Sequence, residues 1–278
     1  MTYTETVASF VKTGATKAQL SARTPGAFFI GSMLAGAYVG IALILAYTCA
    51  AGLPAGVRPL VTGAVFGIGL ILVVFAGAEM FTGHVMYSTF GAMGRSVTPL
   101  DIARTWALVW IGNLAGAALL SFIFIKGGGG VLFAPGSTFL HDTILKKETS
   151  PALELVMRAI LCNWMVCLAI WTAARVQNES AKMIAIAWCL LAFVACGFEH
   201  SVANMTAVCL GLFASPQIGD VGAGLYNLGW VTLGNIIGGA VLVAAAYAWM
   251  ARGDAAAPAS ATPSPQTTVT PTPAAQTH

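Results

Sequence analysis

The stretches GAEMFTGHVM (residues 77–86) and GFEHSVANM (residues 197–205) determine the fold that we predict for this chain. Each stretch places Gly-x-Glu and further polar residues inside a long apolar segment. An ionisable group within an apolar span is energetically costly, so its presence indicates a function. Polar and glycine-rich breaks at matching places in the two halves of a chain are typical of interrupted membrane helices that form a substrate site.

Six apolar stretches surround these two motifs. A helix that crosses a bilayer needs about 20 apolar residues, whereas barrel strands would alternate over about ten. We therefore expect an all-α polytopic membrane protein with six transmembrane helices, of which the second and the fifth are broken by the two motifs. The stretches are 27–51, 60–82, 102–125, 154–175, 181–213 and 220–250.

The composition supports this fold class and excludes others. The 278 residues are 58% hydrophobic and 8% charged, whereas a soluble domain carries about a quarter charged residues. The net charge is +3, so the basic footprint of a nucleic-acid-binding protein is absent. These values exclude a soluble enzyme, a disordered protein and a partner for nucleic acid.

A second pair of similar segments indicates an internal repeat. WIGNLAG (residues 110–116) and WVTLGNIIG (residues 230–238) share the kernel Gly-Asn-x-x-Gly and lie in the third and sixth stretches. Two halves of three spans each must have opposite orientations, because three is odd. We expect an inverted 3+3 repeat, as in many transporters and channels.

The two ends of the chain differ from its middle. Residues 1–24 are polar with spaced apolar positions, which is typical of a cytoplasmic or interfacial helix. Residues 25–252 form the predicted channel domain, and residues 253–278 are a predicted disordered tail. No cleaved signal peptide is expected. With both termini in the cytoplasm, eight Lys and Arg residues lie inside and five outside, which favours that orientation.

His200 is the residue that this pattern singles out. In an apolar setting the neutral imidazole is favoured, and it can still donate a hydrogen bond to an anion. We interpret Glu79 and Glu199 as structural groups that cap the half-helices away from the pathway. A metal site of Glu79, His84, Glu199 and His200 is disfavoured, because adjacent helical residues point about 100° apart. No metal, cofactor or disulfide is expected.

For several other residues the sequence supports two interpretations. Lys147 fits an ordinary solvated loop lysine as well as a group that attracts anions. Bulky side chains near the breaks fit packing as well as constrictions that filter by size and dewetting.

Over roughly residues 5–250 the chain resembles the formate/nitrite transporter family. Within the family it looks most like the nitrite channels, because of Phe-Thr-Gly-His and the tryptophan in Cys-Asn-Trp. The motifs that carry the resemblance are AGAYVG (35–40), EMFTGH (79–84), LCNWMVCLAIW (161–171), GFEHSVANM (197–205) and VTLGN (231–235).

The resemblance implies an aquaporin-like protomer in a homopentamer of the bacterial inner membrane, with one substrate pore per protomer and no enzymatic activity. It implies that His200 is the central pore histidine, with Asn163 and Thr82 beside it and Lys147 in the vestibule. The inner constriction would involve Leu70, Phe66 and Val166, and the outer one Met80, Phe193 and Ala203. The residues with structural roles at the breaks are Glu79, Glu199, Gly83 and Asn204.

The function implied is transport of nitrite. In this mechanism His200 hydrogen-bonds the anion, with or without protonating it transiently. The alternatives are transport of formate, another small monocarboxylate or hydrosulfide by the same fold. A water channel and a metal or haem redox enzyme of the membrane are the more distant ones.

Overall fold

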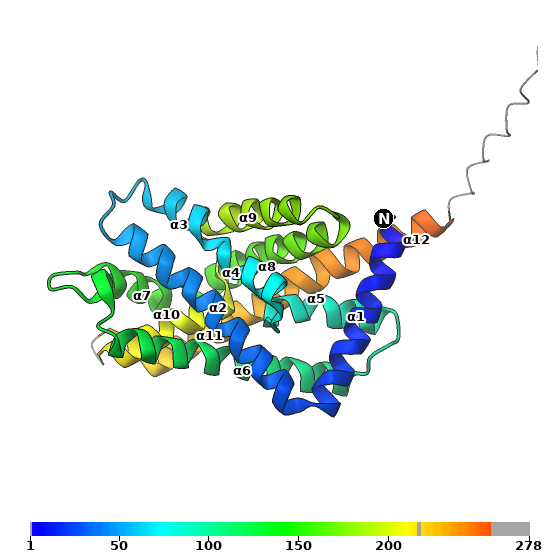
Figure 1. Ribbon diagram of the computed structural model, residues 1–278, viewed down its shortest axis with the longest axis horizontal. Helices are drawn as coiled ribbons and strands as arrows, with labels where there is room; N and C mark the ends of the chain where they lie inside the picture. Colours follow the sequence, from blue (N-terminus) through cyan, green and yellow to red (C-terminus); the bar gives the residue numbers. More distant parts are fainter. Residues whose placement is uncertain (1, 216–217, 257–278) are drawn as a thin grey trace, which may run out of the picture.

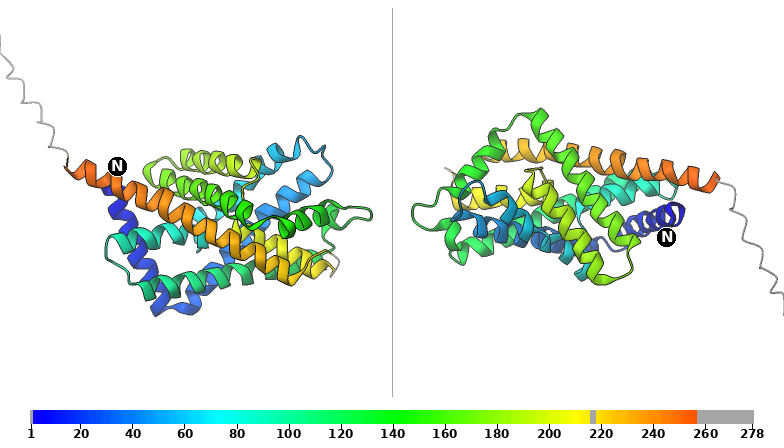
Figure 2. Two further views of the ribbon diagram at one scale, coloured as in Figure 1. Left: turned by 180° about the vertical axis from the view of Figure 1, so that it is seen from behind. Right: turned by 90° about the horizontal axis from the view of Figure 1, so that it is seen from above.

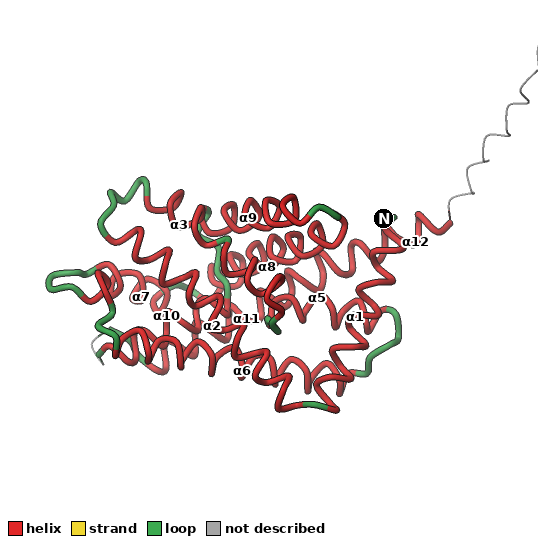
Figure 3. Tube along the Cα trace, viewed as in Figure 1, coloured by secondary structure: helices red, strands yellow, loops and turns green. Residues whose placement is uncertain are grey.

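The protein's structure, a computed structural model, describes residues 2–215 and 218–256. Within these ranges the chain forms helices joined by loops, with no strand (Figure 3). The segments η1 and η3 are π-helices, η2 is a 3₁₀-helix and the others are α-helices. In chain order they are α1 (Tyr3–Arg23), α2 (Pro25–Ala51), α3 (Arg58–Phe66), α4 (Ile68–Leu72), η1 (Val73–Gly77), α5 (Phe81–Met93), α6 (Pro99–Lys126), η2 (Gly130–Phe133), α7 (Phe139–Thr149), α8 (Ala152–Arg175), α9 (Glu179–Ala195), α10 (Ser201–Ala214), α11 (Val221–Ile237), η3 (Gly238–Ala245) and α12 (Ala246–Ala256).

Five helical segments of the described chain are long and apolar enough to cross a membrane. They coincide with five of the six predicted stretches, and their ends differ by a few residues. The helix α6 and the continuous α11–η3–α12 run along the length of the bundle (Figures 1 and 2). The five segments are Pro25–Ala51, Arg58–Gly77, Pro99–Lys126, Ala152–Arg175 and Val221–Gly253.

The remaining predicted stretch, 181–213, contains two helices, α9 and α10, with residues 196–200 between them. The second stretch likewise ends at Gly77, and a new helix, α5, begins at Phe81. Gly77 and Gly197 have φ values of +80° and +71°, in the left-handed region that glycine adopts without strain and that ends helices. The helices α5 and α10 therefore begin inside the bundle, where their first N–H groups need partners.

Glycines let the long helices approach closely beside these two breaks. A Cβ on Gly116 of α6 would lie 1.9 Å from the Met33 carbonyl oxygen of α2. A Cβ on Gly238 would lie 2.3 Å from the Ile160 carbonyl oxygen of α8. Only glycine fits such backbone contacts, which are a common way of packing helices in membranes. Both glycines belong to the repeated Gly-Asn-x-x-Gly kernel.

The first helix packs against the bundle at the end where α12 also lies (Figures 1 and 2). The residue pattern of 1–24 predicted a helix, and α1 begins with a capping box at Thr2. Phe10 stacks against the ring of Trp171, with 5.6 Å between centroids, and the Arg104 guanidinium donates to the Ala18 carbonyl at 3.1 Å. These contacts hold α1 across the mouth of the cavity described below.

The predicted C-terminal tail begins within α12, whose helix continues to Ala256. The rest of that predicted tail, residues 257–278, lies outside the described residues.

Candidate functional site

Three cavities follow one another through the bundle and share wall residues. The first, of about 490 Å³, is lined by Lys17, Glu79 and His84 among others, and we call it the α1 vestibule. The second, of about 220 Å³, is lined by Lys147 and Glu199 among others, and we call it the α7 vestibule. A third cavity of about 10 Å³ lies between them, and we call it the narrow segment.

The shared wall residues show how the cavities connect. Leu70 and Met80 line both the α1 vestibule and the narrow segment. Phe66, Phe193 and His200 line both the narrow segment and the α7 vestibule. A route through the protomer therefore passes Leu70 and Met80 at one mouth and the two phenylalanines with His200 at the other.

The narrow segment is small and almost wholly apolar. A cavity needs about 10–15 Å³ to hold one water molecule, so an ion cannot keep its hydration shell in this space. Among the eight described residues that line it, His200 alone has a polar side chain. The other seven are Val39, Phe66, Leu70, Met80, Val166, Leu190 and Phe193.

The sequence predicted six constriction residues, and five of them line the narrow segment. The sixth, Ala203, lines the α7 vestibule. In the expected grouping Phe66 went with Leu70 and Met80 with Phe193. In the structure the Phe66 ring meets the Phe193 ring edge-on at 5.7 Å, and Met80 lies with Leu70 toward the α1 vestibule.

His200 is held in one tautomer by its position at the start of α10. Its Nδ1 accepts a hydrogen bond from the Ala203 backbone N–H at 3.1 Å, so the side chain caps the helix. An N–H can only donate, which means that Nδ1 carries no proton and that Nε2 of the neutral ring does. Nε2 lies 3.1 Å from Thr82 Oγ1. The Nε2–H of His200, whose ring lines the narrow segment, therefore has Thr82 Oγ1 as its partner in this structure, and protonating Nδ1 would release the cap.

Thr82 and Asn163 were both predicted beside this histidine, and they play different parts. Thr82 contacts His200 directly. Asn163 is fully buried and absent from the walls of the three cavities. Its amide donates to the Asn235 carbonyl at 2.6 Å and to the Thr82 carbonyl at 3.3 Å. Asn163 thus holds the backbone of Thr82 rather than the imidazole.

Asparagines from the repeated kernel stabilise both breaks in the same way. Asn113 Oδ1 accepts from the Phe81 N–H, while its Nδ2 donates to the Glu79 and Ser32 carbonyls. One side chain thereby satisfies two backbone groups of the break, the Phe81 N–H and the Glu79 carbonyl, and ties them to the Ser32 carbonyl inside α2.

The second break repeats this arrangement. Asn235 Oδ1 accepts from the Ser201 N–H, and its Nδ2 donates to the Glu199 and Ala159 carbonyls. The kernel was visible in the sequence, yet the role of its two asparagines was missed. Their position opposite each Gly-x-Glu was the available signal.

The two carboxylates do not cap the half-helices, and this expectation was wrong. The asparagines bind the N–H groups of Phe81 and Ser201, and His200 binds that of Ala203. The carboxylates pair with cations instead. Glu79 pairs with Lys17 Nζ at 2.5 Å, and Glu199 pairs with Lys147 Nζ at 2.7 Å. Both carboxyl groups lie in vestibule walls, outside the narrow segment.

Lys147 lies on α7 and reaches into the vestibule that we named after this helix. It also donates to Asn204 Oδ1 at 2.9 Å, and Asn204 in turn donates to Glu199 at 2.6 Å. Burial lowers the pKa of Lys147, and the nearby Glu199 carboxylate more than offsets this, so the pKa lies above its ordinary value. The ammonium therefore stays charged, which favours the interpretation of Lys147 as an anion-attracting group.

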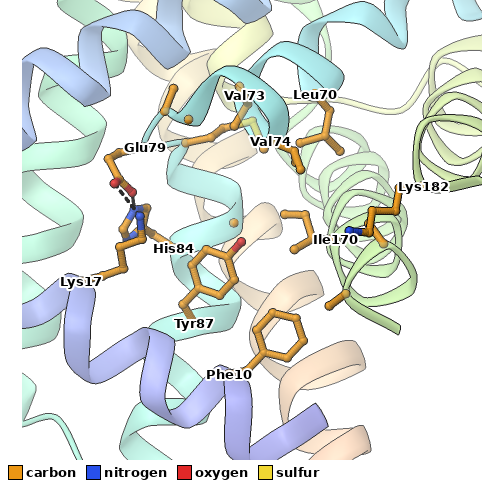
Figure 4. A pocket seen from close by; sticks show the side chains of 16 residues that line it. Phe10, Lys17, Leu70, Val73, Val74, Glu79, His84, Tyr87, Ile170 and Lys182 are labelled. Atoms are coloured by element: carbon orange, nitrogen blue, oxygen red, sulfur yellow. Dashed lines mark hydrogen bonds and ion pairs between the residues drawn. The ribbon is translucent and has the colours of Figure 1, made fainter. Parts of the chain in front are cut away.

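Figure 4 shows the α1 vestibule with Lys17, Glu79 and His84 gathered on one side and Lys182 on the other. Sequence reasoning missed Lys17 as a site residue, because it lies 62 residues from Glu79 and looks like an ordinary terminal lysine. Gly83, predicted as structural, also lines this cavity, and a Cβ there would lie 3.1 Å from the Ile170 side chain.

Both vestibules carry more basic than acidic side chains. In the α7 vestibule Lys146, Lys147 and Arg158 face one carboxylate, Glu199. In the α1 vestibule two lysines line the wall with Glu79. Basic side chains in a cleft raise the local concentration of anions, although Arg158 and Lys182 are also paired with Glu154 and Glu179. Of the four residues considered for a metal site, Glu79 and His84 are in contact in the α1 vestibule, whereas Glu199 and His200 line the α7 vestibule. The described chain holds no group of three or more His, Cys, Asp and Glu suited to a metal ion.

Comparisons with known proteins agree on one family. A family model described as "Formate/nitrite transporter" matches residues 4–249. The "Nitrite transporter NirC" of Escherichia coli (strain K12) is 45% identical over 253 residues, which is 90% of this chain and 92% of that protein. The "Formate channel FocA" of the same strain is 35% identical over 242 residues, which is 79% of this chain and 84% of that protein.

Two solved structures resemble the protein. An "FNT family ion channel" has a TM-score of 0.85 and 42% identity, covering 89% of this chain and 99% of that one. A "Pentameric formate channel with formate bound" has a TM-score of 0.68 and 29% identity, covering 80% and 95%. With its apolar helices, the chain is a multi-pass membrane protein of all-helical fold, and it belongs to the formate/nitrite transporter family.

Proposed function

We propose that this protein transports nitrite across the bacterial inner membrane, through the α1 vestibule, the narrow segment and the α7 vestibule in either direction. The observation that carries the proposal is the narrow segment itself, an apolar space of about 10 Å³ with one polar side chain between two basic vestibules. The name of the relative at 45% identity supports nitrite as the substrate.

The energetics of the narrow segment explain how an anion is handled there. The basic side chains of the vestibules draw in a small monovalent anion. Desolvating an unpaired ion in an apolar space is very costly. The Nε2–H of His200 supplies a hydrogen bond at this point, and the neutral acid, HNO₂, crosses the segment more easily than its anion. Transient protonation by His200 itself requires that Nδ1 first leave the Ala203 N–H.

The constrictions belong to the same proposal. Leu70 and Met80 form the barrier toward the α1 vestibule, and Phe66 and Phe193 form the barrier toward the α7 vestibule. Val166 lines the space between them. Ala203, beside His200 in the α7 vestibule, widens that entrance because its side chain is small.

The proposed architecture is an inverted repeat of two three-span halves, in which α5 and α10 are the second halves of the two broken spans. The matching hydrogen bonds of Asn113 and Asn235 support it. The shared end of α1 and α12 supports placing both termini on one side, and the lysine and arginine bias favours the cytoplasm. One similar solved structure is titled a pentameric channel, and we propose the same assembly for this chain.

Formate remains the main alternative substrate, because formate channels are also among the relatives. Their identity to this chain is lower, at 35% against 45% for the nitrite transporter. The enzymatic alternatives receive no support from the relatives, whose names describe transporters and channels.

Nitrite entry into proteoliposomes tests the proposal. We expect the purified protein to admit nitrite well above the rate of protein-free liposomes, and formate to compete only when present in excess. If formate entered rapidly while nitrite entered no faster than into protein-free liposomes, the substrate would be formate. The transport proposal as a whole would be contradicted if both anions entered no faster than into protein-free liposomes, provided that size-exclusion chromatography shows the protein to be folded.

A further inference from the structure

A carboxylate and a histidine form a close pair in the wall of the α1 vestibule (Figure 4). His84 Nε2 lies 2.8 Å from Glu79 Oε2, and the other oxygen of Glu79 binds the Lys17 ammonium. The His84 side chain is 1% exposed and packs edge-on against the rings of Phe28 and Tyr87. The pair is therefore fixed in orientation at the inner edge of a cavity.

The contact with Glu79 determines which nitrogen of His84 is free. An ionised carboxylate can only accept hydrogen bonds, so Nε2 carries the proton of the neutral ring. Nδ1 is then an acceptor, and it is buried with no hydrogen-bond partner among the described residues. Most buried polar atoms in proteins are paired, so an exception calls for an explanation. A carboxylate that holds an imidazole with its second nitrogen free is the arrangement that makes histidine an effective base.

The matching position in the other half of the chain has no such base. Asn204 follows Glu199 by five residues, as His84 follows Glu79, and it contacts that glutamate. Lys147 pairs with Glu199 as Lys17 pairs with Glu79. Because an amide does not take up a proton at ordinary pH, the two vestibules differ in this one property. His200 does not supply it, since its Nδ1 caps α10.

We propose that His84 is the proton-exchange site of the α1 vestibule, where it separates the neutral acid into an anion and a proton. The inference rests on the proposed function, in which the neutral acid crosses the narrow segment. As HNO₂ arrives past Met80, the side chains packed on His84 move to open access to its buried Nδ1, and the O–H bond of the acid breaks while an N–H bond forms there. Nitrite is left beside the Lys17 ammonium. The imidazolium is balanced by the Glu79 carboxylate and returns its proton to water in the vestibule. Outward transport reverses these steps.

The surroundings of His84 are suited to this exchange. Burial opposes the protonated ring most strongly, the Glu79 carboxylate stabilises it, and the Lys17 ammonium opposes it. Tyr87 is the titratable neighbour on its own helix. Lys182 of α9 lines the same cavity, and its ammonium pairs with Glu179 at 2.8 Å. An exchange that used water alone would not need a histidine in this wall.

The test is His84→Asn, which gives the α1 vestibule the side chain that the other half already has. Nitrite flux is measured in proteoliposomes while pH is varied on one side at a time, with sidedness read from protease cleavage of an N-terminal tag. For the wild type we expect flux to change at least threefold with pH on the α1 side. His84→Asn should lose most of that response, so that flux then depends on pH on the α1 side no more strongly than on pH on the α7 side. His141→Asn, on the exposed α7 surface, is the matched control and should behave as the wild type.

An unchanged α1-side response in His84→Asn would overturn the inference while leaving nitrite transport intact. Absence of nitrite flux in the wild type would instead contradict the proposed function. A second measurement tests the inference even if His84→Asn does not transport nitrite. ¹⁵N NMR of histidine-labelled full-length protein in nanodiscs, assigned with His84→Asn and His200→Asn, should show Nδ1 of His84 gaining a proton as pH falls and responding to added nitrite. A His84 signal that ignores both pH and nitrite would also overturn the inference.

Discussion

Replacing Asn235 by leucine is expected to prevent the protein from reaching a stable fold. The change leaves the Ser201 N–H and the Glu199 carbonyl of the break without the partner that now satisfies both, and it removes the bond that ties them to α8 at the Ala159 carbonyl. Each unpaired buried group costs about 1–3 kcal/mol, and water cannot replace the lost partner within a membrane. Proteins are stable by only about 5–15 kcal/mol, so the two unpaired groups and the lost bond to α8 together remove a large part of the total.

The measurement is the melting temperature in detergent, together with the fraction of protein that runs as a single species on size-exclusion chromatography. Asn113→Leu should have a similar effect, because it removes the equivalent three bonds at the first break. Leu233→Ala is the control, since Leu233 lies on the same helix as Asn235 and is 43% exposed. If the Asn235→Leu protein had the same melting temperature as the Leu233→Ala control, the asparagine would not be what stabilises the break.

Replacing His200 by leucine is expected to reduce nitrite flux by about 10- to 150-fold. This range converts the 1.5–3 kcal/mol typical of a hydrogen bond to a charged group at about 1.4 kcal/mol per tenfold in rate. Leucine removes both the donor in the narrow segment and the cap on α10. The measurement is initial nitrite flux per folded protein, compared with the wild type in the same liposomes.

His200→Asn separates the two roles of this residue. The amide oxygen of asparagine can accept from the Ala203 N–H where Nδ1 does now, so the helix cap survives and the oligomer should assemble. The imidazole is gone, and we therefore expect an altered dependence on pH or an altered preference between nitrite and formate. Wild-type flux at every pH and with both anions would contradict a role for His200 in transport.

The sequence predicted five of the apolar spans and the helix ends beside Gly77 and Gly197 because these are local properties. Hydrophobicity over about 20 residues places a span, and Gly77 and Gly197 end their helices through their own backbone conformations. His200 was found for the same reason, since one ionisable residue in an apolar stretch is visible without any knowledge of its neighbours. Its tautomer was not, because that depends on the Ala203 N–H and on Thr82 from the other half of the chain.

The partners of the two glutamates could not be predicted from the sequence. Lys17 and Glu79 are far apart along the chain and meet only because α1 folds back over the cavity. The capping interpretation was wrong because it considered each break alone. The asparagines that satisfy the breaks come from α6 and α11. Likewise, which mouth of the narrow segment each apolar residue faces is set by the packing of α3, α9 and the first break.

The central claim is that nitrite passes through the narrow segment, and blocking that segment tests it most directly. Val166 is 2% exposed and lines a space of about 10 Å³, so Val166→Trp should fill it. Val241→Trp makes the same change at a residue that is 55% exposed, and Val166→Phe is a smaller obstruction for the case in which tryptophan overpacks the core. The measurement is initial nitrite flux per folded protein for all three variants and the wild type. We expect nitrite to enter liposomes with the folded Val166 variants no faster than protein-free liposomes, and to enter at the wild-type rate with Val241→Trp. Wild-type flux through a folded Val166→Trp protein would mean that nitrite takes another route.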